Sequence, residues 1–240
     1  MITFAKRCMK EIIRDPLNIF FGVGFPVVLL LLLSAIQSNV PVDLFRIERL
    51  TPGITVFGLS FMTLFSATLV SRDRESAFLQ RLFTTPLRSF DFILGYMLPL
   101  LPLSLAQSVV CYLVAILLGL DPSFNIILAI VGMVPVSLLY ISLGLLCGSL
   151  FNVKQVGGIC GALLTNLSAW LSGVWFDIEL LGETITKGSR FLPFIHAVEL
   201  ERKILSGAIE GALVNLGVVS VYSIVITVFA ILIFLREMKK

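Results

Sequence analysis

The sequence predicts an all-α membrane protein, and two observations support that fold class. First, 58% of the 240 residues are hydrophobic and 14% are charged, with a mean hydropathy of +1.02, whereas an ordinary soluble domain has about 25% charged residues. Second, the apolar residues gather in long blocks, and a helix needs roughly 20 apolar residues to cross the hydrocarbon core. We therefore expect the chain to lie in a lipid bilayer.

An amphipathic helix is expected at the start of the chain, over residues 1–16. Its charged residues alternate with apolar ones at helical spacing, and the pair Asp15-Pro16 ends it. We expect this helix to be an interfacial one.

Six apolar blocks follow and predict six transmembrane helices within a single domain that covers residues 1–240. The first block is longer than the 7 to 15 apolar residues typical of a cleaved signal peptide, so we expect it to be retained. The predicted spans are residues 17–37, 53–70, 92–120, 124–150, 156–176 and 212–235.

Basic residues are divided unevenly between the two sides of this predicted bundle. Twelve lysines and arginines lie on the side of the N-terminus and six lie in the opposite loops. Basic loops are held on the cytoplasmic face. We therefore expect a multi-pass protein of the cytoplasmic membrane with both termini in the cytoplasm.

Several classes of function are disfavoured by what the sequence lacks. The four cysteines form no disulfide or zinc pattern, and the single histidine excludes motifs that need two. No phosphate-binding G-x-x-x-x-G-K-[ST] loop occurs, and the basic residues form no nucleic-acid-binding block. No charged residue lies deep inside any of the six blocks, whereas an ion-coupled carrier usually keeps an ionisable residue within the membrane. We therefore expect no catalytic, cofactor or metal site in this chain. If transport is uphill, its energy must come from another polypeptide.

Two glycine pairs predict close helix packing. Gly144 and Gly148, and also Gly157 and Gly161, are four residues apart, which places each pair on one helical face. Such pairs serve either internal packing or a contact between two copies of the chain, and both alternatives remain open at this point.

A short amphipathic helix is predicted in the cytoplasmic segment 71–86. Its apolar residues between Phe78 and Phe83 share one face, its charged residues Glu75 and Arg81 are free to face a soluble partner, and Pro86 stops it. The alternative is a helix that lies on lipid headgroups.

This segment resembles the signature region of the ABC-2 type permeases. In that family the usual pattern is E-R-E-x-G-x-L-x-R-L-x-x-T-P, followed by a short helix that leads to G-K. The matching residues are Asp73, Arg74, Glu75, Leu79, Arg81, Leu82, Thr85, Pro86 and Gly95. Ala77 stands where the family commonly has glycine, and Tyr96 stands where it has lysine.

A second segment, residues 191–207, lies outside between the fifth and sixth predicted spans. It resembles the family's extracellular P-x-x-h-A-x-E-x-x-R helix, which belongs to a pair of re-entrant half-helices. The gate candidates that this resemblance implies are Pro193, Phe194, His196 and Glu199. For His196 a structural hydrogen-bonding role is the alternative, because the sequence puts no second titratable group beside it.

The resemblance covers the whole chain and implies a permease subunit that exports its substrate. Two permease copies, identical or paralogous, would form the pathway in the lipid bilayer. Two separate ATPase subunits, which bind ATP and magnesium, would dock beneath them. The residues that the resemblance assigns to this ATPase coupling are Arg74, Glu75, Phe78, Arg81 and Leu82.

The second and fifth spans are the predicted lining of the pathway. The lining candidates are Phe57, Ser60, Phe61, Thr63 and Phe65 on the second span and Thr165, Asn166 and Trp170 on the fifth. The alternative for the phenylalanine stripe is packing in the core.

An uncharged aromatic lining suits an amphiphilic, lipidic or drug-like substrate. The rival within the family is export of a polysaccharide or lipid-linked glycan. An intramembrane enzyme would need a nucleophile–base pair or metal ligands, and a passive channel or scaffold would have no use for the signature segment.

Overall fold

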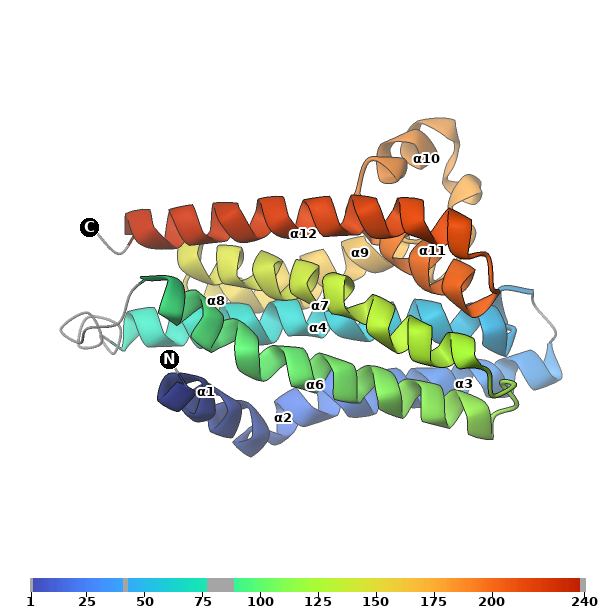
Figure 1. Ribbon diagram of the computed structural model, residues 1–240, viewed down its shortest axis with the longest axis horizontal. Helices are drawn as coiled ribbons and strands as arrows, with labels where there is room; N and C mark the ends of the chain where they lie inside the picture. Colours follow the sequence, from blue (N-terminus) through green and yellow to red (C-terminus); the bar gives the residue numbers. More distant parts are fainter. Residues whose placement is uncertain (1, 41–42, 77–88, 238–240) are drawn as a thin grey trace.

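The computed structural model describes residues 2–40, 43–76 and 89–237, and every regular element within those residues is a helix (Figure 1). Within the described residues, five helices are long and apolar enough to cross a membrane. The prediction of a multi-pass helical membrane protein is therefore confirmed. The five are the run α2–η1–α3 (Pro16–Asn39) and the helices α4 (Ile47–Glu75), α6 (Ser89–Leu117), α7 (Phe124–Leu150) and α12 (Ile209–Glu237).

These helices lie side by side, so the bundle has two ends (Figure 1). The α1 end carries α1 (Ile2–Arg14) and the last turns of α4 and α7. The α11 end carries α11 (Pro193–Leu205) and the first turns of α7 and α12. These two names are used below.

The fifth predicted span, residues 156–176, is not one of the five long apolar helices. Three short elements occupy it, α8 (Val153–Val156), the π-helix η3 (Gly157–Leu164) and α9 (Thr165–Leu171). The helical run ends at Leu171 and includes the polar residues Lys154 and Gln155, so it is shorter and more polar than its neighbours. The count of six spans remains a prediction.

Helix α4 forms the centre of the bundle, since nearly all of its residues from Leu50 to Val70 are buried. It extends beyond the predicted 53–70 at both ends because polar residues there, such as Thr51, bond to the helix backbone (Thr51 Oγ1 to Ile47 O, 2.7 Å). In contrast, α7 has the bounds that its apolar block predicts.

Close packing of α7 on α4 depends on glycine. A Cβ atom at Gly144 would lie 1.8 Å from Ser66 Oγ and 2.2 Å from the carbonyl oxygen of Thr63, and one at Gly148 would lie 2.5 Å from that of Ala67. The hydroxyl groups of Thr63 and Ser66 donate to backbone carbonyls of α7 at 2.9 and 3.0 Å. The first glycine pair therefore serves packing within one chain.

Helix α1 packs its apolar face on α6 of its own chain. Phe4, Cys8 and Ile12 are buried, and the ring of Phe4 meets that of Tyr96 edge to face at 4.9 Å between centroids. Gly95 permits this approach, because a Cβ there would lie 2.3 Å from Phe4 Cδ1. The amphipathic helix is present, but its buried stripe faces the bundle, and its position on the membrane surface remains a prediction.

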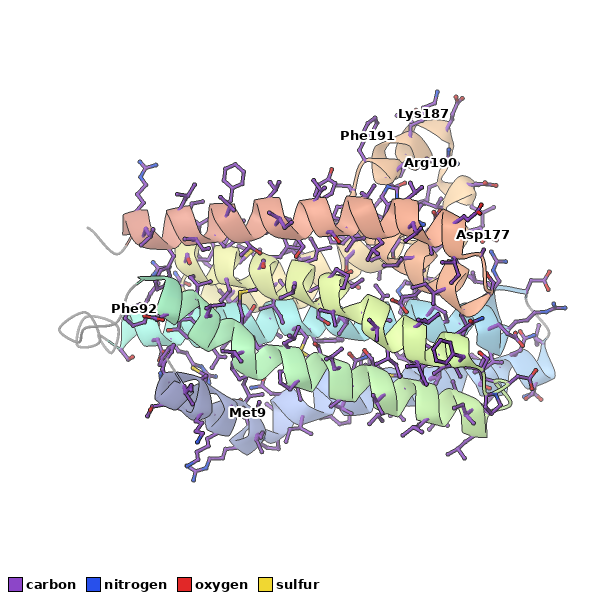
Figure 2. All side chains as sticks on the ribbon, viewed as in Figure 1. Met9, Phe92, Asp177, Lys187, Arg190 and Phe191 are labelled. Carbon is purple, nitrogen blue, oxygen red and sulfur yellow. The ribbon has the colours of Figure 1, made fainter. Side chains whose placement is uncertain are left out.

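The segment before α12 is also helical. It contains η4 (Ile178–Leu181), α10 (Glu183–Arg190) and α11. In Figure 2, α10 projects from the bundle with Lys187 and Arg190 on its surface, whereas most of α11 is buried against α4, α7 and α12. The re-entrant character of these helices is not tested by their packing.

Candidate coupling site

Two of the five predicted coupling residues, Arg74 and Glu75, belong to the last turn of α4. The other three, Phe78, Arg81 and Leu82, lie outside the described residues. Of the amphipathic helix expected over 71–86, residues 71–75 are the end of α4, and residues 77–86 also lie outside the described part of the chain. The described part of the site is therefore the end of α4 and the helices that it contacts.

Arg74 fastens α4 to the last turn of α7. Its Nη1 donates to the carbonyl oxygen of Gly148 at 2.8 Å and also to that of Ser149. The last carbonyls of a helix have no helical donor and carry partial negative charge. A guanidinium group is therefore a favourable partner at this position.

Glu75 makes the complementary contact on the other side of the α7–α8 connection. Its Oε1 accepts from the backbone N–H of Val153 at 2.9 Å, at the start of α8. The first N–H groups of a helix carry partial positive charge, which favours a carboxylate. Asn152 and Gln155 complete the cap of this helix with reciprocal bonds.

Glu75 is exposed and its Oε1 is bonded to the backbone of its own chain, so a contact of its charge with a soluble partner stays a prediction. Arg74 and Glu75 both bond to their own chain, because the two helix ends beside them offer unpaired carbonyl and N–H groups. Arg74 and Glu75 thus bond the last turn of α4 to the end of α7 and the start of α8.

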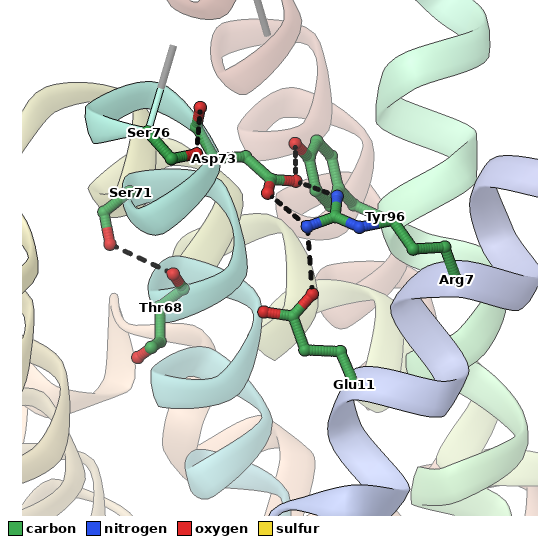
Figure 3. Close-up of polar contacts among 7 residues, drawn as sticks. All are labelled: Arg7, Glu11, Thr68, Ser71, Asp73, Ser76 and Tyr96. Atoms are coloured by element: carbon green, nitrogen blue, oxygen red, sulfur yellow. Dashed lines mark hydrogen bonds and ion pairs between the residues drawn. The ribbon is translucent and has the colours of Figure 1, made fainter. Parts of the chain in front are cut away.

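A third residue, Asp73, links the same turn of α4 to α1 and α6 (Figure 3). Both guanidinium Nη atoms of Arg7 donate to its carboxylate, each at 2.7 Å. The hydroxyl of Tyr96 donates to Asp73 Oδ2 at 2.8 Å. Glu11 lies 3.1 Å from the same guanidinium. We call Arg7, Asp73 and Tyr96 the Asp73 cluster.

Electrostatics favour the charged form of this cluster. The carboxylate of Asp73 is 3% exposed, and a buried charge is tolerated when it is paired and hydrogen-bonded. The hydrogen bond from Arg7 to Asp73 raises the pKa of the guanidinium, so it stays protonated. Burial, helped by the nearby Asp73 charge, raises the pKa of Cys8 to about 12, so this thiol is unreactive at neutral pH.

Asp73 is part of the signature run, but the sequence does not identify its partners. Arg7 is 66 residues away along the chain, and Tyr96 stands at a position where the resembled family has lysine. In this chain the phenol of Tyr96 donates to Asp73 from that position.

The predicted gate residues lie on α11. Phe194 is buried and stacks on Tyr140 of α7 at 6.0 Å between centroids. The two ring nitrogens of His196 lie 2.9 Å from Asn215 Oδ1 and 2.9 Å from the carbonyl oxygen of Arg190. These two contacts fit the alternative of a structural hydrogen-bonding role for His196. Glu199 contacts Lys203 and Asn215, and Pro193 begins α11.

The predicted lining residues of α4 pack inside the single chain. The rings of Phe57 and Phe61 meet at 5.7 Å, and Thr63 donates to the backbone of α7. The residues Phe57, Ser60, Phe61, Thr63 and Phe65 are all less than 9% exposed. Since a lining residue must be reachable, α4 would have to repack before these side chains could contact a substrate.

The predicted lining residues of the fifth block differ among themselves. Thr165 is buried and donates to the carbonyl of Cys160 at 2.8 Å, whereas Asn166 and Trp170 are exposed on α9. A pathway role for this exposed pair stays a prediction.

These features define a class: a multi-pass helical membrane protein whose central helix, α4, is hydrogen-bonded at one end to α1, α6, α7 and α8. The model of the ABC-2 type transporter family matches residues 1–206, and the chain therefore belongs to that family. It is a transporter permease subunit, of a kind that typically works with an ATPase partner. Searches of the curated proteins and of the solved structures found no match.

Proposed function

We propose that this permease subunit exports an amphiphilic, lipidic or drug-like substrate with energy from a separate ATPase. Two ATPase subunits that bind ATP and magnesium would act beneath a pair of permeases, either two copies of this chain or this chain and a paralogue. The observation that carries the proposal is the fastening of the last turn of α4 by Asp73, Arg74 and Glu75. Motion of the chain after Ser76 would pass through this turn to α1, α6, α7 and α8.

A sixth crossing by residues 153–171 is part of the proposal. Support comes from contacts at the two ends of this run. Val153 donates to Glu75 at the α1 end, whereas the carbonyl of Gly173 accepts from Arg202 Nη2 of α11 at 3.0 Å. Six crossings bring both termini to the same side, which the distribution of basic residues assigns to the cytoplasm.

Energy supply by a partner is tested with purified protein in vesicles. We expect no ATP hydrolysis by the chain alone, and hydrolysis together with transport once a partner ATPase is added, because the sequence offers no phosphate-binding loop. Phosphate release and uptake of a fluorescent amphiphile would be measured in parallel. ATP turnover by the isolated permease, or transport that persists without any ATPase, contradicts the proposal.

Orientation is tested by thiol labelling in intact cells. A Lys187→Cys variant on α10 should react with an impermeant maleimide, and a Lys10→Cys variant on α1 should react only after the cells are permeabilised. The four native cysteines are buried and should give little background. The reverse pattern would place the termini outside and overturn the proposed topology.

A further inference from the structure

The polar face of α1 carries a hollow whose lysines the Asp73 cluster does not use. The hollow has a volume of about 860 Å³ and extends along α1 to the junction with α2. Its charged lining residues are Lys6, Arg7, Lys10 and Arg14, with the acids Glu11 and Asp15. Basic side chains therefore outnumber acidic ones in this hollow.

The two acids already have partners in their own chain. Glu11 lies 3.1 Å from the guanidinium of Arg7. Oδ1 of Asp15 accepts from the backbone N–H of Leu17 at 3.1 Å and so caps the start of α2. These carboxylates do little to neutralise the remaining cations.

The remaining cations form a row on one face of the helix. Lys6, Lys10 and Arg14 are four residues apart, so they follow one another along the helix over about 12 Å. All three are exposed, and none forms an ion pair with another of the described residues. The hollow therefore presents three accessible positive charges to a ligand and is suited to an anion.

The hollow also lies where the chain enters the membrane. Pro16 lines it and is the first residue of the run Pro16–Asn39, which is long and apolar enough to cross. Large apolar side chains beside this point are exposed, namely Ile13 at 55%, Leu17 at 65% and Phe20 at 50%. A residue that begins a span lies near the boundary of the hydrocarbon core. The cations are therefore close to the depth of the lipid headgroups, with a surface for acyl chains next to them.

We propose that this hollow binds an anionic phospholipid such as phosphatidylglycerol, with its acyl chains against Leu17 and Phe20. The phosphate oxygens accept charge-assisted hydrogen bonds from Lys6, Lys10 and Arg14. The guanidinium can bind a phosphate through two parallel N–H bonds, whereas each lysine acts as a point charge.

The apolar side chains and the row of cations together select this ligand. A zwitterionic phospholipid brings its own cation, which would be repelled by the row. A free phosphate or the acidic surface of a soluble protein would satisfy the cations and leave Leu17 and Phe20 uncovered. The site is independent of the substrate that the transporter moves.

The test uses the full-length protein in nanodiscs of phosphatidylcholine. A photoactivatable phosphatidylglycerol, with a diazirine near the head of one acyl chain, is added, and cross-linked peptides are mapped by mass spectrometry. A phosphatidylcholine probe with the same chains is the comparison. We expect the anionic probe to label residues 13–21 in preference to the zwitterionic one, and the preference should fall at high salt because charges at a surface are screened.

Neutralising two of the cations should remove most of this preference. Lys6→Gln/Lys10→Gln should lower labelling of residues 13–21 by the anionic probe by about tenfold or more, since each cation near an anionic surface contributes about fivefold, the factor that 1 kcal/mol gives. Labelling by the zwitterionic probe should not change. Lys154→Gln/Arg236→Gln is the matched control, because both side chains are exposed at the α1 end and neither lines the hollow. Lys6→Arg/Lys10→Arg should label as the parent does.

Three results would overturn the proposal. Equal anionic labelling in the parent and in Lys6→Gln/Lys10→Gln would mean that these cations do not select the lipid. Loss of labelling when inorganic phosphate replaces chloride at equal ionic strength would assign the hollow to a free anion. Unchanged labelling combined with loss of ATPase co-purification in Lys6→Gln/Lys10→Gln would assign it to a soluble partner.

Discussion

Replacing Asp73 with alanine is expected to destabilise the permease strongly and to abolish ATP-driven transport. The change leaves Arg7 without its carboxylate and Tyr96 without its acceptor. Removal of one partner of a buried ion pair costs about 3–5 kcal/mol. We expect the lower part of this range, because the Arg7 side chain is 37% exposed and water can solvate it. Thermal unfolding of the purified protein and transport in vesicles would be measured.

A double-mutant cycle separates the contact from other effects of the substitution. Arg7→Ala and the double variant Arg7→Ala/Asp73→Ala complete the cycle, and we expect an interaction free energy of about 0.5–3 kcal/mol, as for residues in one network. The control is Asp43→Ala, which breaks an exposed pair with Arg46 at 3.2 Å and should cost about 0–1 kcal/mol. Strictly additive effects of the two single changes would mean that the Asp73 cluster does not hold α1 to α4.

The fold class follows from local features of the sequence, and this explains which elements could be predicted. An apolar block is recognised from its own residues, so the five long helices were found, and α7 has its predicted bounds. Residues 153–171 are harder, because Lys154, Gln155 and the glycines of η3 make this run less apolar than a lipid-facing span.

Burial within the bundle could not be predicted in the same way. Lipid and helix partner are both apolar, so a phenylalanine stripe looks the same whether it faces a neighbour, lipid or a substrate. Phe57, Phe61 and Phe65 belong to the core. Contacts such as Arg7 with Asp73 join residues 66 positions apart and depend on how α1 folds back on α6, which no local pattern reports.

The charges of Arg74 and Glu75 show a further limit of pattern reading. Glu75 was expected to face a soluble partner because it lies opposite the apolar face, and Arg74 was assigned to ATPase coupling by the resemblance. The ends of α7 and α8 are nevertheless nearer partners, since each helix end presents unpaired backbone groups of the opposite charge. The described part of the candidate site is therefore bonded within the chain, and its contact with an ATPase stays a prediction.

Gly144→Ala is the second change for which we expect a large effect, because it forces α7 away from the central helix. The new Cβ would lie 1.8 Å from Ser66 Oγ and 2.2 Å from the carbonyl oxygen of Thr63. A rotated serine side chain relieves the first clash, but the second involves the α4 backbone. Overpacking of this kind costs typically about 1–3 kcal/mol, occasionally more. Separation of the helices also weakens the bonds from Thr63 and Ser66 to α7.

We expect Gly144→Ala to lower the unfolding temperature and the yield of monodisperse protein, both measured by fluorescence-detected size-exclusion chromatography after heating. Gly157→Ala is the matched control, since nothing lies within 4 Å of a Cβ at that helical position. Alanine there should be neutral or stabilising by up to about 1 kcal/mol, because glycine is the poorer helix former. If the two variants unfold at the same temperature, α4 and α7 do not meet at Gly144, and the glycine pair must serve another contact, such as one between two copies of the chain.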